Sequence, residues 1–229
     1  MFPLKSLIPS IALFATLVAG RGIVTNPPAR SAGAATLAAC GAGVYNILYN
    51  DVWAPIEEAA AQIDAGYNAT ACHLFFCRGL QYKDNAWNTR VYTPSTVVPF
   101  HVFIEDNDTG YANVSVVNLS AQQTIGAPLA LWPVYANASL SPSHQLNNES
   151  ERRNHSSPLS LMPTYCKILS TAASNSFLFF FLGHLTADFA VTIPDLGTQC
   201  TRPGACALQW FWYAYDHHTY ESCVDFTTA

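Results

Sequence analysis

Short apolar segments with a two-residue period most constrain what this chain can fold into. Six of them lie between residues 98 and 226, at residues 98–105, 112–119, 127–135, 189–193, 207–215 and 220–226. In the first, Phe100, Val102 and Ile104 occupy every second position, as in a strand with one buried face. Turn sequences such as Asp108-Thr109-Gly110 separate the segments. The pattern predicts an all-β fold, an antiparallel β-sandwich.

The region before these strands predicts long loops and one short helix. Pro27-Pro28 fixes an extended start, and residues 31–40 are small and rich in alanine. Residues 55–63 begin with proline and carry glutamates at positions 57 and 58. Proline suits the first turn of a helix, and acidic side chains there interact favourably with the helix dipole.

The first 20 residues have the layout of a secretory signal peptide. They contain one cation, Lys5, then an apolar core, and end in the small residues Ala19 and Gly20. Such a core of roughly 7–15 residues is too short to span a bilayer. Cleavage after Gly20 would leave residues 21–229 as a single domain starting at Arg21. An uncleaved anchor is the alternative, which the lack of a longer apolar run disfavours.

The composition agrees with an extracellular protein. Half of the 229 residues are hydrophobic and 11% are charged, which is enough apolar material for a buried core. The net charge of −5 argues against nucleic acid as a partner, because phosphate binding needs clustered cations. Seven cysteines indicate an oxidising compartment and disulfide bonds. We expect a secreted monomer without a membrane span.

Seven Asn-x-Ser/Thr motifs indicate N-glycosylation, which also belongs to secreted proteins. They lie at Asn68, Asn107, Asn113, Asn118, Asn137, Asn148 and Asn154. The last two belong to a segment of different composition, residues 143–183, which is rich in Asn, Ser, Arg and His and ends in a Phe/Leu run. We interpret this segment first as a translated intron, with a disordered insertion or a membrane-contacting lid as alternatives.

The segment 143–183 also contains Cys166, so that six cysteines remain outside it. Six cysteines allow 15 connectivities. Short intervening loops favour Cys72–Cys77 and Cys200–Cys206, and Cys40–Cys223 would then join the N-terminal region to the last strand.

Three stretches resemble one family. They are residues 22–30 (Gly-Ile-Val-Thr-Asn-Pro-Pro-Ala-Arg), residues 109–117, and residues 209–213 together with 219–226. In these stretches the chain is similar to the fungal secreted chitin-binding type-4 proteins, which are similar to lytic polysaccharide monooxygenases. The resemblance implies an immunoglobulin-like sandwich that binds copper through an N-terminal histidine and a second histidine, and that cleaves chitin or cellulose oxidatively.

Carried over position by position, the copper site implied by the family is degenerate. Arg21 stands at the place of the N-terminal histidine and Asp108 at that of the second. Tyr220 matches the aromatic residue near the axial position, and Gln209 is a weaker match to a polar neighbour of the metal. A guanidinium stays protonated and has no free lone pair for a metal. We therefore expect an Arg21–Asp108 ion pair in place of copper, and no cofactor.

Two further features bear on this site. A glycan on Asn107, directly before Asp108, would stand over the face that meets polysaccharide. His217-His218, in the turn before Tyr220, offers the one serious alternative source of imidazole. In the cluster Trp210-Phe211-Trp212-Tyr213 the side chains should alternate between core and surface, and an exposed aromatic face would suit sugar stacking.

These features predict a non-catalytic protein that binds chitin, cellulose or cell-wall glucan. One alternative is a copper-dependent polysaccharide monooxygenase with an atypical ligand set. Another is a non-functional product of a faulty gene model, which would include the segment 143–183.

Overall fold

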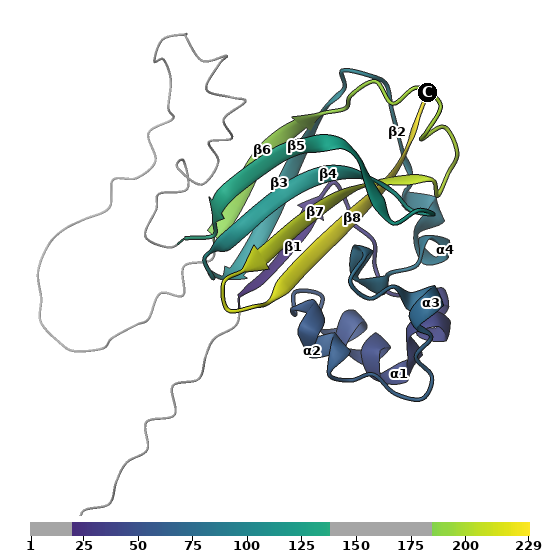
Figure 1. The fold of residues 1–229 in the computed structure, drawn as a ribbon, viewed down its shortest axis with the longest axis vertical. Helices are drawn as coiled ribbons and strands as arrows, with labels where there is room; N and C mark the ends of the chain where they lie inside the picture. The colour runs from purple at the N-terminus through teal and green to yellow at the C-terminus, as the bar shows by residue number, and fades with distance from the viewer. Residues whose placement is uncertain (1–19, 138–184) are drawn as a thin grey trace, which may run out of the picture.

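A computed structural model describes residues 20–137 and 185–229, and Figure 1 shows their arrangement. The leader at 1–19 and the segment 143–183, with Cys166, Asn148 and Asn154, lie outside the described residues. The predicted signal peptide and insertion therefore stay predictions.

Eight strands in the described part of the chain form two sheets (Figure 1). The three-stranded sheet has the order β1-β3-β6, made of Arg21–Asn26, Val97–Asp106 and Leu185–Thr192. The five-stranded sheet has the order β2-β8-β7-β4-β5, made of Arg90–Tyr92, Thr219–Thr228, Cys206–Ala214, Gly110–Asn118 and Gln123–Tyr135. Neighbours are antiparallel, except for the parallel pair of β2 with β8.

The two sheets bury one core between them, so the predicted sandwich-like, mainly β fold is confirmed. Trp210 and Trp212 of β7 are fully buried, whereas Phe211 and Tyr213, which alternate with them, face outward and are half-buried. The alternation predicted for this cluster is therefore present. Contact between the sheets is direct, since the ring centroid of Trp132 on β5 lies 4.7 Å from that of Phe189 on β6.

All six predicted strands form, with ends that differ by a few residues. The sequence pattern missed β1 and β2. The first is only half-buried at alternate positions, and the second has three residues, two of them exposed. Neither presents enough apolar residues to show a period.

The N-terminal region is more helical than the predicted loops. It contains α1 (Ala34–Asn50), α2 (Ile56–Ala60), α3 (Ala69–Cys72), η1 (Cys77–Gly79), α4 (Tyr82–Asn85) and η2 (Ala86–Asn88). The predicted helix at 55–63 corresponds to α2, which ends three residues earlier. Alanine favours helix formation, but Gly41 and Gly43 disfavour it, so α1 could not be recognised from the sequence. Gly41 has a φ of 78° and interrupts α1.

The helices lie against β8 and beside β1 (Figure 1) and enclose a second, smaller core. Glu57 of α2 accepts hydrogen bonds from the backbone N–H and the hydroxyl of Thr219, at 2.8 and 2.7 Å, and so fixes the start of β8. Among the described helices, none has the length and apolar character needed to cross a bilayer.

Two of the three predicted disulfides are wrong. The structure contains Cys200–Cys206 as predicted, but joins Cys40 to Cys72 and Cys77 to Cys223. Helix α1 packs on α3 and brings the Cα atoms of Cys40 and Cys72 to 4.8 Å. Loop length favoured Cys72–Cys77 only because α1 was not predicted. The actual Cys77–Cys223 bond ties the helical region to β8.

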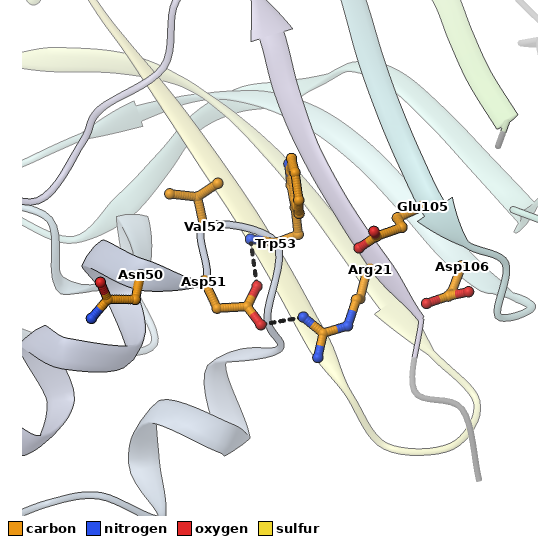
Figure 2. Close-up of a pocket in the computed structure, with 7 residues that line it drawn as sticks. All are labelled: Arg21, Asn50, Asp51, Val52, Trp53, Glu105 and Asp106. Carbon is orange, nitrogen blue, oxygen red and sulfur yellow. Dashed lines mark hydrogen bonds and ion pairs between the residues drawn. The ribbon is translucent and has the colours of Figure 1, made fainter. Parts of the chain in front are cut away.

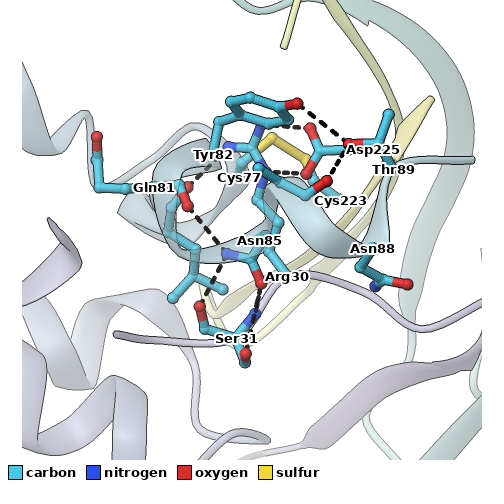
Figure 3. A network of polar contacts seen from close by, with 12 residues as sticks. Arg30, Ser31, Cys77, Gln81, Tyr82, Asn85, Asn88, Thr89, Cys223 and Asp225 are labelled. Carbon is cyan, nitrogen blue, oxygen red and sulfur yellow. Dashed lines mark hydrogen bonds and ion pairs between the residues drawn. A yellow bond between two sulfur atoms is a disulfide. The ribbon is translucent and has the colours of Figure 1, made fainter. Parts of the chain in front are cut away.

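A buried ion pair joins the same two parts of the molecule (Figure 3). The Arg30 guanidinium donates two hydrogen bonds to the Asp225 carboxylate on β8, at 2.7 and 2.6 Å, and a third to the Leu80 carbonyl at 2.7 Å. The two charged side chains are 6% and 2% exposed. Breaking such a pair leaves one buried charge without compensation.

Replacing Arg30 by methionine tests this link. The variant R30M keeps much of the side-chain volume but leaves Asp225 unpaired, so the free energy of unfolding should fall by about 3–5 kcal/mol. Denaturant titration of the wild type and of R30M measures the change.

The matched control is R202A, since Arg202 is exposed and its loss should change stability by no more than about 0.5 kcal/mol. Equal effects of the two substitutions would contradict the assigned role of the Arg30–Asp225 pair.

Candidate functional site

One end of the sandwich gathers the start of β1, the β3–β4 loop and the β7–β8 hairpin (Figure 1). The backbone N–H of Tyr215 in the hairpin donates to the Thr109 carbonyl in the loop at 2.8 Å. A Cβ atom built on Gly20 would lie 3.0 Å from Cβ of Asp108. The hydroxyl of Tyr220 on β8 donates to the Gly20 carbonyl. The predicted site residues Arg21, Asp108 and Tyr220 thus meet at this end.

Arg21 does not pair with Asp108, which corrects the predicted ion pair. Its guanidinium instead donates to the carboxylate of Asp51, the residue that follows α1. This hydrogen bond raises the pKa of Arg21. The two side chains are 29% and 30% exposed, and partly exposed pairs contribute little to stability, about 0–1 kcal/mol. The pair therefore orients its side chains more than it stabilises the fold.

The Arg21–Asp51 pair lies in an open groove of about 400 Å³ (Figure 2). The residues that line it are Arg21, Asn50, Asp51, Val52, Trp53, Glu105 and Asp106. Trp53 is half-buried, and its ring centroid lies 5.8 Å from that of Phe103 on β3. The Asp51 carboxylate also accepts a hydrogen bond from the Trp53 backbone N–H at 3.3 Å. The groove thus combines an indole ring with fixed hydrogen-bonding groups.

A buried arginine holds the backbone of this groove from below. The Arg78 guanidinium donates to the carbonyls of Val52 and Asp51, and the residue is 4% exposed. Burial lowers the pKa of Arg78 to about 10, so the side chain remains protonated at neutral pH. The backbone of Arg78 has a φ of 56°, a left-handed conformation that is costly for a residue other than glycine. The backbone at Asp51 and Val52 is therefore tied to a buried side chain.

Asp108 belongs to a separate cluster beside the groove. Asp108, Asp216 and His218 each have an atom that could bind a metal, a carboxylate oxygen or a ring nitrogen. These three atoms lie within 4.8 Å of one another. His218 contacts the Asp216 carboxylate through its ring and donates its backbone N–H to the other oxygen at 3.1 Å. Burial and the neighbouring Asp216 carboxylate raise the pKa of Asp108 to about 6. His217 points elsewhere, with its ring 2.8 Å from the Tyr213 hydroxyl.

The remaining two predicted positions cannot face an open site together. Tyr220 is 1% exposed and stacks on Trp212, with ring centroids 4.4 Å apart. Gln209 lies on the opposite, outer face of the five-stranded sheet, since it alternates with the inward-facing Trp210 and Trp212. It hydrogen-bonds the buried Glu221.

These residues do not fit a copper centre of the kind that the family resemblance implies. That centre needs an amine and two imidazoles, because nitrogen ligands suit copper. Here the first position carries a guanidinium already bound to Asp51, and the second carries Asp108. His218 supplies one imidazole, together with two carboxylates, to the cluster. Oxygen-rich sets of this kind bind divalent cations with little selectivity for copper.

The groove itself was not predicted from the sequence. Asn50 is the last residue of α1, Asp51 and Trp53 follow it, and all three line the groove together with Arg21 of β1. A polar and aromatic run directly before Pro55 was the available signal. Glu105 ended a predicted strand and Asp106 followed it, and neither was given a functional role.

Comparisons with known proteins add little to this geometry. No protein-family model matches the chain, and no curated protein matches it. A solved structure described as a chitin binding domain from Burkholderia pseudomallei matches over 92% of this chain and 100% of that chain. The sequence identity is 12% and the TM-score is 0.34. A TM-score this low establishes neither a shared fold nor a shared function.

Glu221, beneath the groove, gives the protein a predictable pH dependence. Burial raises the pKa of Glu221 from 4.5 to about 7, although hydrogen bonds from the Arg78 backbone and from Gln209 lower it. Between these two values the folded state binds more protons than the unfolded state, so stability falls as the pH rises. E221Q cannot ionise and should escape this loss, which corresponds to about 3 kcal/mol at most.

Thermal unfolding of both proteins at pH 5 and pH 8 measures the difference. We expect E221Q and the wild type to be similar at pH 5 and E221Q to be more stable at pH 8. E58Q is the control, because Glu58 is exposed. A gap between E221Q and the wild type that is the same at both pH values would contradict the assigned ionisation.

Proposed function

We propose that this protein is a secreted, non-catalytic polysaccharide-binding protein that holds chitin, cellulose or cell-wall glucan in the groove of Figure 2. The observation that carries the proposal is the pairing of an indole ring with an ordered set of polar groups around one open hollow. The groove is open to solvent, so a polymer longer than the site can extend beyond it.

The chemistry of the groove matches that of a sugar. The face of a pyranose ring carries aliphatic C–H groups, which pack on an aromatic ring such as that of Trp53. Its hydroxyls both donate and accept hydrogen bonds, and the Asn50 amide and the carboxylates of Glu105 and Asp106 provide partners. Charged partners make the stronger hydrogen bonds.

Several groove residues are already held before any ligand binds. Asp51 is fixed by Arg21 and by the Trp53 backbone, and Arg78 holds the carbonyls of Asp51 and Val52. Less conformational entropy is then lost on binding, which favours affinity.

Secretion is supported by the leader-like sequence and by three disulfides in a chain of this size. An immunoglobulin-like strand arrangement, one domain over residues 21–229 and a monomeric state belong to the same proposal. The absence of two imidazoles from the site residues supports binding without oxidative cleavage.

Substitution of Trp53 tests the proposal. The wild type should be retained on at least one of insoluble chitin, cellulose and β-glucan. W53A should bind about 30-fold more weakly, because truncating an aromatic residue at the centre of a binding site costs about 2 kcal/mol or more. Binding isotherms on the washed polymer measure both affinities.

Trp87 provides the matched control, since it is 79% exposed and is not among the residues of the groove. W87A should bind like the wild type. No retention of the wild type on any polymer, or equal loss in W53A and W87A, would overturn the assignment. Release of oxidised oligosaccharides with copper and a reductant would refute the non-catalytic part.

A further inference from the structure

We infer that Asn113 carries an N-linked glycan whose first sugar residue packs on a strip of aromatic side chains on the outer face of the five-stranded sheet. This aromatic strip consists of Tyr111 on β4 and Phe211 and Tyr213 on β7. The inference requires passage through the secretory pathway. It is independent of which ligand binds in the groove.

The aromatic strip is one continuous surface. Tyr111 pairs with Tyr213 in the register of β4 with β7, and their ring centroids are 5.6 Å apart. The centroid of Phe211 lies 6.0 Å from that of Tyr111. Tyr111 is 39% exposed, and Phe211 and Tyr213 are half-buried. Three adjacent rings on an outward sheet face offer the kind of surface on which a pyranose stacks.

Asn113 lies within this surface. It is two residues after Tyr111 on the same strand, so both side chains point to the same face of the sheet. Its register partners are Phe211 on β7 and Leu131 on β5, and Leu131 is 48% exposed. A sugar attached to Asn113 would start between apolar side chains on both neighbouring strands and next to the Tyr111 ring.

In the folded protein the Asn113 side chain is oriented so that it can carry a glycan. The hydroxyl of Ser115, the third residue of the sequon, donates to Oδ1 of Asn113 at 3.0 Å. This contact turns the oxygen along the strand and leaves Nδ2 for a substituent. In the transfer, Nδ2 loses one proton and bonds to C1 of the first sugar, while the bond from C1 to the phosphate oxygen of a polyprenyl diphosphate–linked oligosaccharide breaks and the polyprenyl diphosphate leaves.

The other described sequons lack this combination. The residues two positions before Asn68, Asn107 and Asn118 are Gly66, Glu105 and Val116, and none of these is aromatic. Tyr135 precedes Asn137 by two positions but is fully buried. Among the described sequon asparagines, Asn113 is therefore the only one with an exposed aromatic residue two positions before it. Its glycan is expected to protect the strip and to add stability, which a glycan at Asn118 should not.

The test uses the full-length protein secreted from a eukaryotic host. Glycopeptide mass spectrometry should find Asn113 occupied. After trimming to a single sugar, the N-acetyl methyl resonance of the Asn113 glycan should be shifted upfield by the aromatic rings. N113Q should lower the Tm by about 2–4 °C, the shift expected for about 1 kcal/mol in a chain of this size. N118Q should leave the Tm unchanged.

The double substitution separates glycan packing from other effects of N113Q. In a Y111A background, N113Q should no longer lower the Tm, because the sugar has lost its partner. Amidase removal of the glycans, which leaves aspartate at every occupied site, should lower the Tm of the folded wild type by about 2–4 °C more than it lowers the Tm of N113Q. An unoccupied Asn113, an unshifted methyl resonance or an equal Tm loss with and without Tyr111 would overturn the inference.

Discussion

The buried pair of Arg30 and Asp225 is the contact on which the rest of the arrangement depends. It joins three parts of the chain, namely the segment after β1, the helical region through the Leu80 carbonyl, and β8. The disulfide between Cys77 and Cys223 joins η1 to the same strand. With α1 and its neighbours held against β8, the residues after α1 reach the start of β1. The groove exists because these two links bring a helix and a strand together.

The sheets could be predicted from the sequence because their period is local. Phe100, Val102 and Ile104 reveal β3 without reference to any other part of the chain, and Trp210 and Trp212 reveal the inner face of β7. The helical region could not be predicted in this way. Gly41 interrupts α1, and the pairing of Cys40 with Cys72 depends on how two helices pack. Loop length is a poor guide where the intervening chain is folded.

In the candidate site too, local sequence indicated which residues matter but not which residues they contact. Arg21, Asp108 and Tyr220 lie at one end of the sandwich, but the predicted pairing of Arg21 with Asp108 is absent. Arg21 contacts Asp51 from the helical region, and Asp108 contacts Asp216 and His218 from the β7–β8 hairpin. A sequence motif can indicate which residues lie in the same region of the fold. The partner of each charge depends on long-range packing, which no local pattern encodes.

Two surfaces of this molecule suit a sugar, and their chemistry gives them different roles. The aromatic strip has rings and an attachment point within it at Asn113, and none of its three members carries a charge. The groove has one indole and several charged or amide groups held by Arg21 and Arg78. A tethered sugar needs little affinity, because attachment keeps its effective concentration high. A free polymer must supply all of its binding energy through contacts, and charge-assisted hydrogen bonds provide more of it. The strip therefore suits the protein's own glycan, and the groove suits a ligand from outside.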